Sequence, residues 1–277
     1  MGITDRNKIR VAVIDMNNGA ANQGMRGIQE ILSRYRADTG IDMPFDVFDL
    51  RARGECPGLD YDIYISSGGP GNPYDGVGEQ WEQDFFDLLD GITQFNAKHE
   101  LKKYVFLICH SFQMACRKFH VGNVIRRRST AFGIFPVFMT EEGEHDLVFS
   151  GLPNPFYTVD SRDWQVVNPQ DVLFSNPDAR VLALEKERPH VDLERCVMAV
   201  RFTAEIVGTQ FHPEADPAGM KMYLLQEEKK QAIIASHGVQ KYQDMLQSLD
   251  DEEKLQLTQS VVLPNFLNEA LNALQEA

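Results

Sequence analysis

The chain has 277 residues, 43% of them hydrophobic, and its 41 acidic and 27 basic side chains give a net charge of −14. This composition can bury a full hydrophobic core without disulfides, and the negative charge argues against binding to nucleic acid or to anionic membranes. The apolar run nearest the N-terminus, residues 11–14, is too short for a signal peptide or a membrane span, and four cysteines without metal-ligand spacing predict free thiols in the cytoplasm.

Strands and helices alternate in the first part of the chain. Residues 9–15 form a continuous apolar run, as in a strand that is buried on both faces of a parallel sheet, and residues 25–35 then show helical spacing. The same reasoning predicts further strands at residues 46–50, 61–65 and 104–108, and a helix at residues 81–89. This order predicts a doubly wound α/β fold, with a mostly parallel sheet, helices on both faces and ligands at the carboxyl ends of the strands.

The rest of the chain is predicted to complete the sheet and then to form helices. Extended runs at residues 132–140, 181–184, 196–202 and 206–208 precede a helix capped by Asp216 and Pro217, with a stop near Gly238. A last helix is expected to begin near Pro264. We therefore expect a domain at residues 1–215 and an acidic helical extension at residues 216–277. The extension would pack on the core or join two copies of the chain in a homo-oligomer.

A cysteine lies at the end of one predicted strand. Cys109 directly follows residues 104–108 and precedes a helix, where the helix N-terminus and a nearby imidazolium would stabilise its thiolate. His212 and Glu214 follow another apolar strand. These residue types suit a nucleophile, a base and an acid that orients the base. A cysteine at a strand end is more often a packing residue, so the prediction needs further support.

A glycine-rich motif supplies that support. Gly68 and Gly69 lie in the segment Ser-Ser-Gly-Gly-Pro-Gly that follows the strand at residues 61–65. Adjacent glycines let backbone N–H groups point at an oxyanion, and the N–H of His110 would be the second donor. Alone, the motif predicts only a tight turn. With the cysteine and the histidine, it predicts a site for acyl transfer.

In this order, the motifs resemble those of the class I glutamine amidotransferases, over roughly residues 8–215. The resemblance implies a flavodoxin-like fold and hydrolysis of the glutamine side-chain amide through a γ-glutamyl thioester, without cofactor or metal. The freed ammonia would pass to a synthase domain or subunit. The implied roles are Cys109 as nucleophile, His212 as base, Glu214 as its partner, Gly69 and His110 as oxyanion donors, and Gly68 and Gln113 as substrate contacts.

The sequence departs from the family pattern at three places. Leu107 and Ser111 stand where the family usually has glycine, two residues before and after the nucleophile. Leu107 implies that a neighbouring strand or helix leaves more room. Ser161 and Arg162 stand where the family often has a Ser-His pair that binds the backbone end of glutamine. An arginine there would meet a carboxylate, or would indicate a substrate other than free glutamine.

Three functions therefore remain open. The first is a glutaminase that supplies ammonia to a synthase, and the second is a γ-glutamyl hydrolase or peptidase with the same triad. The third is a protein without catalysis that binds a metabolite or a partner. The intact triad argues against the third function, whereas the three departures shift weight from the first towards the second.

Overall fold

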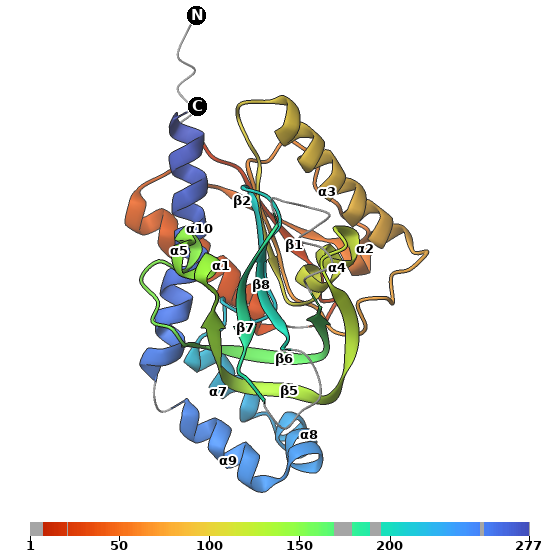
Figure 1. Ribbon diagram of the computed structural model, residues 1–277, viewed down its shortest axis with the longest axis vertical. Coiled ribbons are helices and arrows are strands. Elements are labelled where there is room, and N and C mark those ends of the chain that lie inside the picture. Colours follow the sequence, from red (N-terminus) through yellow and green to blue (C-terminus); the bar gives the residue numbers. More distant parts are fainter. Residues whose placement is uncertain (1–7, 21, 169–178, 189–194, 250–251, 277) are drawn as a thin grey trace, which may run out of the picture.

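Nine strands form one mixed sheet in the part of the chain that the computed structural model describes, residues 8–20, 22–168, 179–188, 195–249 and 252–276 (Figure 1). They lie in the order β2-β1-β3-β4-β9-β8-β7-β5-β6. Their bounds are β1 Val11–Asp15, β2 Phe45–Asp49, β3 Ile63–Ser66, β4 Tyr104–Ile108, β5 Asn123–Met139, β6 Phe156–Val167, β7 Arg180–Glu185, β8 Val197–Arg201 and β9 Ile206–Thr209. The strands from β2 to β9 in this order pair in parallel, and those from β9 to β6 are antiparallel.

Helices cover both faces of the parallel part. The helices are α1 Gln23–Thr39, α2 Leu50–Arg53, α3 Gln80–Lys98, α4 His110–Lys118, α5 Glu141–His145, α7 Pro217–Leu224, α8 Glu227–His237, α9 Val239–Ser248 and α10 Glu252–Glu276, with a 3₁₀ turn, η1 Leu147–Phe149. Val13 and Phe106 pack on one face with α1 and α10, and Ile14 and Leu107 pack on the other with α3 and α4 (Figure 1). Strands β1 and β4 are continuous apolar runs, and successive side chains alternate between the two faces, so both faces are apolar. The predicted doubly wound fold is confirmed.

The antiparallel part of the sheet includes a long ribbon made by β5 and β6. Figure 1 shows the two strands side by side across the lower part of the molecule. Their register shifts between Arg126 and Ala131, as at a β-bulge, which increases the local bend of a strand. Val159 of β6 contributes to a third apolar cluster with α7, α8 and α9. This ribbon brings Ser161 over the end of β4, where Cys109 lies.

The C-terminal helices differ from the prediction at two points. The first predicted helix is divided into α7 and α8, which are separated at Gln226 by an extended residue. The last helix does not begin near Pro264, since α10 starts at Glu252 and continues through the proline. Proline leaves the carbonyl four residues earlier without its N–H donor. That carbonyl belongs to Ser260, an exposed residue that water can reach, whereas buried Leu263 and Leu267 hold both sides of the proline against the core.

Helix α10 is anchored by a buried ion cluster as well as by apolar packing. Arg201 of β8 donates two hydrogen bonds of 2.6 Å to Asp146 and two more, of 3.0 and 3.1 Å, to Glu269 of α10. Phe266 packs edge-on against Phe106 of β4. Helix α10 therefore shares the core of the sheet, and a domain boundary at residue 215 stays a prediction. None of the helices in the described ranges combines the length and apolar character needed to cross a bilayer.

Candidate active site

Three neighbouring parallel strands deliver the three sequence motifs to one edge of the sheet. The order β3-β4-β9 places the glycine loop that follows β3 on one side of Cys109, and His212, which follows β9, on the other. The strands are parallel, so their carboxyl ends meet at the same edge, as the fold class predicts. The topology therefore brings together residues that are about one hundred positions apart in the sequence.

Cys109 forms a sharp turn between β4 and α4. Its backbone has φ 49° and ψ −96°, and positive φ is uncommon for a residue with a side chain. The turn is held by the Cys109 N–H, which donates to Thr209 O at 2.7 Å, and by the Gln113 N–H, which donates to Cys109 O at 2.9 Å. This is the geometry of a nucleophile elbow, which presents the side chain at the start of a helix.

His212 lies beside both Cys109 and Glu214. Its Nδ1 is 2.8 Å from Glu214 Oε1. Its ring and Cys109 both lie against Gly68, where an added Cβ would be 2.8 Å from His212 Cε1 and 3.4 Å from Cys109 Cβ. The His212 side chain is 18% exposed and that of Glu214 is 1% exposed. Burial acts to lower the pKa of His212, but the Glu214 carboxylate and the Cys109 sulfur outweigh it, so this pKa lies well above its ordinary value. A protonated His212 beside Cys109 favours a thiolate–imidazolium pair.

Glu214 is held in place by α1 and α10. A Cβ at Gly24 would lie 2.8 Å from Glu214 Oε1, and one at Gly27 would lie 2.3 Å from Glu214 O. Two glycines of α1 therefore allow the turn that carries Glu214 to approach the helix. From α10, Gln259 Nε2 donates to Glu214 O at 3.4 Å. The C-terminal helices thus support the position of the orienting carboxylate.

The glycine loop needs glycine because other groups come very close to it. A Cβ at Gly68 would lie 2.8 Å from His212 Cε1, and one at Gly69 would lie 2.2 Å from Met16 O. Arg51 Nη1 donates to Met16 O at 3.1 Å and to Pro70 O at 2.7 Å, and so holds the loop from outside. In the described part of the chain, the N–H of Gly69 has no hydrogen-bond acceptor, as an oxyanion donor requires.

His110, the other predicted oxyanion donor, also has a backbone N–H without an acceptor among the described residues. Its side chain is 1% exposed, and its Nε2 has no hydrogen-bond partner there. Burial, together with Arg51 and Arg117, lowers the pKa of His110 to about 3, against the weaker opposing effect of Asp75. The ring is therefore neutral, and the backbone is the part of this residue that is suited to catalysis.

The buried His110 ring predicts an acid-dependent loss of stability. Between about pH 6.5 and pH 3, the unfolded chain binds a proton at this residue that the folded chain does not, so stability falls as the pH falls. In His110→Leu, the free energy of unfolding should fall less steeply on acidification, by about 1.4 kcal/mol per pH unit. Urea unfolding at several pH values measures both slopes. The slopes of unfolding free energy against pH should coincide for the native protein and His110→Leu above pH 7. Equal slopes below pH 6 would contradict a neutral buried ring.

The structure explains how Leu107 is accommodated beside the nucleophile. Leu107 pairs with Gly208 of β9, and a Cβ at Gly208 would lie 3.0 Å from Leu107 O and 3.1 Å from Leu107 Cβ. The neighbouring strand therefore leaves room for the leucine, as the sequence implied. Leu107 is fully buried among apolar side chains on the face that carries α3 and α4.

Ser111 uses its hydroxyl to connect α4 to the glycine loop. Its Oγ donates to Ser67 O at 2.6 Å and lies 2.7 Å from Ser66 Oγ. A hydroxyl has one proton to donate, so Ser66 is the donor in the second bond. Ser67 Oγ in turn accepts from the Met16 N–H and donates to Gly68 O. A serine in place of the usual glycine thus fixes the loop that precedes Gly69.

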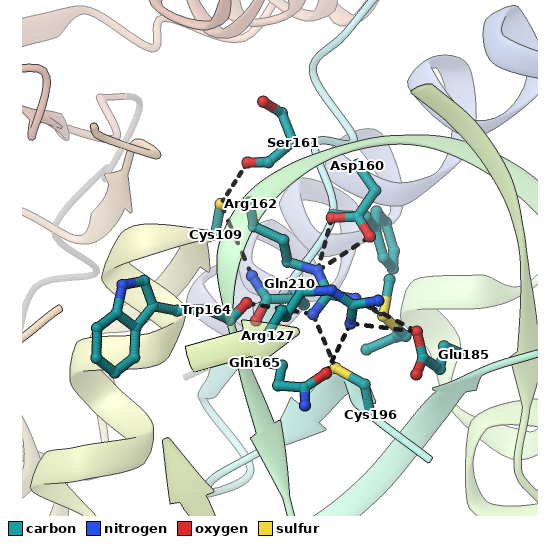
Figure 2. A network of polar contacts seen from close by, with 12 residues as sticks. Cys109, Arg127, Asp160, Ser161, Arg162, Trp164, Gln165, Glu185, Cys196 and Gln210 are labelled. Atoms are coloured by element: carbon teal, nitrogen blue, oxygen red, sulfur yellow. Dashed lines mark hydrogen bonds and ion pairs between the residues drawn. The ribbon is translucent and has the colours of Figure 1, made fainter. Parts of the chain in front are cut away.

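The guanidinium of Arg162 is engaged inside the protein, and its role as a substrate contact stays a prediction. Its side chain is 2% exposed, and Nε donates to both carboxylate oxygens of Asp160, at 2.8 and 3.0 Å. The remaining guanidinium nitrogens contact Trp164 O, Cys196, Met198 and Glu185. Figure 2 shows this buried cluster, with Gln210 between it and Cys109. Alternate residues of a strand face opposite sides, so Arg162 points inward whereas Ser161 is exposed.

Two of the other predicted substrate contacts, Ser161 and Gln113, lie next to Cys109 or behind it. The Cys109 thiol donates to Ser161 O at 3.9 Å, so the backbone of Ser161 covers the sulfur (Figure 2). Gln113 is 3% exposed, and its Nε2 donates to Trp164 O and to Gln210 Oε1. The sequence did not single out Gln210, which donates to Cys109 Sγ at 3.7 Å. The available signal was its position two residues before His212, at the end of the same strand.

The remaining cysteines are free thiols in surroundings unlike that of Cys109. Burial raises the pKa of Cys56 to about 11, with Asp84 and Asp87 adding to the effect. Burial also raises the pKa of Cys116 and of Cys196. Within the described ranges, no group of three His, Cys, Asp or Glu side chains is arranged to hold a metal ion.

Comparison with known proteins agrees with this geometry. The family model described as "Glutamine amidotransferase class-I" matches residues 26–232, and a search of curated proteins found no match. A glutamine amidotransferase from Thermotoga maritima has 18% identity and a TM-score of 0.68, over 95% of this chain and 98% of its own. A glutamine amidotransferase from Methylobacillus flagellatus has 14% identity and a TM-score of 0.68, over 97% of this chain and 96% of its own.

A third solved structure is the glutaminase domain of Trypanosoma brucei CTPS with bound acivicin. It has 13% identity and a TM-score of 0.58, over 97% of this chain and 94% of its own. At identities this low, the solved structures show a shared fold alone. The family model covers most of the chain, including all three motifs. The chain therefore belongs to the class I glutamine amidotransferase family.

Proposed function

We propose that this protein hydrolyses the side-chain amide of glutamine through a γ-glutamyl thioester on Cys109 and passes the ammonia to an acceptor enzyme. The observation that carries the proposal is that Cys109, His212, Glu214 and the glycine loop lie together at one edge of the sheet. His212 hydrogen-bonds the Glu214 carboxylate at 2.8 Å, and both His212 and Cys109 lie within 3.4 Å of the position that a Cβ at Gly68 would take. The glycine loop lies beside the same two side chains. Thiolate, acid–base group and oxyanion donors are the groups that acyl transfer requires.

The reaction begins with attack of the Cys109 thiolate on the amide carbon. The new C–S bond turns the carbonyl into an oxyanion, which the N–H groups of Gly69 and His110 stabilise. His212 gives its proton to the amide nitrogen, the C–N bond breaks, and ammonia leaves. Water then gives a proton to His212 and attacks the thioester. Glutamate leaves and the thiolate–imidazolium pair is restored.

The placement of the three departures removes a reason to prefer other γ-glutamyl compounds to glutamine. Leu107 packs in the core beside Gly208, and Ser111 bonds to the loop backbone. The guanidinium of Arg162 is occupied by Asp160. All three side chains are buried in contacts within the protein, so they no longer favour a γ-glutamyl hydrolase.

Covalent capture tests the nucleophile. A diazoketone analogue of glutamine should add one inhibitor mass to the native protein and none to Cys109→Ala, as measured by intact mass. A matched control is Cys56→Ala, which should label like the native protein, because burial keeps Cys56 protonated at neutral pH. Failure of the native protein to label under reducing conditions would argue against both enzymatic functions and would favour a binding protein.

Product analysis separates the two enzymatic functions. Ammonia release from glutamine should exceed turnover of γ-glutamyl dipeptides, and a preference for the dipeptides would instead indicate a γ-glutamyl hydrolase. A synthase that binds this chain and stimulates ammonia release would identify the acceptor. Because many reactions of this type need the acceptor for full rate, both assays are run with and without co-purifying proteins.

A further inference from the structure

Gln210 contacts the nucleophile from the buried end of β9. Its Nε2 lies 3.7 Å from Cys109 Sγ, and its side chain is completely buried. Sulfur is a large, soft acceptor, so an N–H donor at this distance makes a hydrogen bond that is stronger when the sulfur is a thiolate. Gln210 is thus a neighbour of the nucleophile in addition to His212, which lies beside Cys109 at Gly68.

The orientation of the Gln210 amide follows from its neighbours. Trp164 O can only accept hydrogen bonds, so Gln113 must turn its Nε2 towards it, at 3.2 Å. The same Nε2 donates to Gln210 Oε1 at 3.1 Å. The oxygen of Gln210 is thereby directed at Gln113, which leaves its Nε2 for the sulfur. A reversed Gln210 amide would place two N–H donors against each other at Gln113 and two acceptors against each other at a Cys109 thiolate.

The chain of hydrogen bonds starts at Trp164 O, which a charged side chain also contacts. Arg162 Nη1 also donates to Trp164 O, at 3.2 Å, and the guanidinium is held by Asp160 on the same strand (Figure 2). Gln113 therefore donates to Gln210, and Gln210 donates to Cys109, so both amide N–H groups point along the chain of hydrogen bonds towards the sulfur. Ser161 O makes the opposite contact, because a carbonyl oxygen accepts from the neutral thiol and repels a thiolate.

We propose that Gln210 is a second hydrogen-bond donor to the Cys109 thiolate, and that Gln113 is a positioning residue that sets the direction of its amide. The inference deepens the proposed function and rests on it for its role in turnover. Its test does not depend on turnover, because alkylation of the thiolate by iodoacetamide needs neither glutamine nor an oxyanion. That reaction forms an S–C bond and releases iodide.

The experiment measures the rate of Cys109 alkylation against pH, by peptide mass. Gln210→Met keeps the length of the side chain and removes the donor. We expect the midpoint of its pH profile to rise by about one pH unit, and the rate at pH values below the native midpoint to fall by up to about tenfold. Gln113→Met keeps the donor but frees its direction, so it should give a smaller rise. Gln83→Met, a change at an exposed residue of α3, should alkylate like the native protein.

An unchanged midpoint in both Gln210→Met and Gln113→Met would overturn the proposal and leave the contact as packing alone. If Gln210→Met fails to fold, as seen by thermal unfolding, the Gln113→Met profile decides the question. A native protein that releases no ammonia from glutamine, yet shows the expected shift in Gln210→Met, would refute the proposed function and support this inference. If the native protein releases ammonia from glutamine and the midpoints of both variants are unchanged, the proposed function is supported and this inference is refuted.

Discussion

Glu214→Gln is expected to lower kcat/KM for glutamine hydrolysis by about 10³ to 10⁴-fold, an effect of the size seen when a triad carboxylate is neutralised. Glu214 Oε1 lies 2.8 Å from His212 Nδ1, and the carboxylate is the charge that most strongly raises the pKa of His212. Without it, the pKa of His212 falls, because burial still lowers this pKa and the strongest opposing effect is gone. Less of the imidazolium that protonates the leaving amide nitrogen is then present at a given pH.

The pH dependence gives this prediction a second readout. In the native protein the raised pKa of His212 keeps the ring protonated as the pH rises, so the alkaline decline in rate begins late. In Glu214→Gln that decline should begin at lower pH. Ammonia release measured across neutral and alkaline pH provides both profiles, and Glu187→Gln, at a side chain that is 79% exposed, is the matched control. A rate within a few-fold of native would show that Glu214 does not orient the base.

The second large effect is expected for Gly69→Ala. The added Cβ would lie 2.2 Å from Met16 O and 3.1 Å from Arg51 Nη1, so the loop must move. Its backbone N–H would move with it, away from the position of the oxyanion. Loss of one such donor lowers kcat by about 10² to 10³-fold.

The controls for Gly69→Ala separate loss of the oxyanion donor from loss of the nucleophile. Alkylation of Cys109 by iodoacetamide should stay close to the native rate, because this reaction forms no oxyanion. Gly91→Ala, where the added methyl group meets only the Leu59 side chain at 3.4 Å or more, should keep full activity. Equal losses of alkylation and ammonia release would show that the substitution disturbs the elbow itself.

Much of the fold could be predicted because strands buried on both faces are continuous apolar runs. The strands at residues 11–15 and 104–108 are examples, and the predicted ends lie within about two residues of the observed ones. The path of α10 could not be predicted in this way. Proline at position 264 signals a helix start, and only the burial of Leu263 and Leu267 against the sheet shows why the helix continues through it.

For the site, the sequence alone determined which residues lie at strand ends. Cys109, His212 and the glycine loop follow apolar runs directly, and strand ends meet at one edge in a parallel sheet. Tertiary structure decided the direction of each side chain around them. Arg162 turns into a buried ion cluster, because the pairing of β6 with β5 sets which face of β6 is inward. Gln210 turns towards the Cys109 sulfur, because Gln113 holds its amide oxygen. Such contacts join residues far apart in the chain, so local sequence patterns carry no record of them.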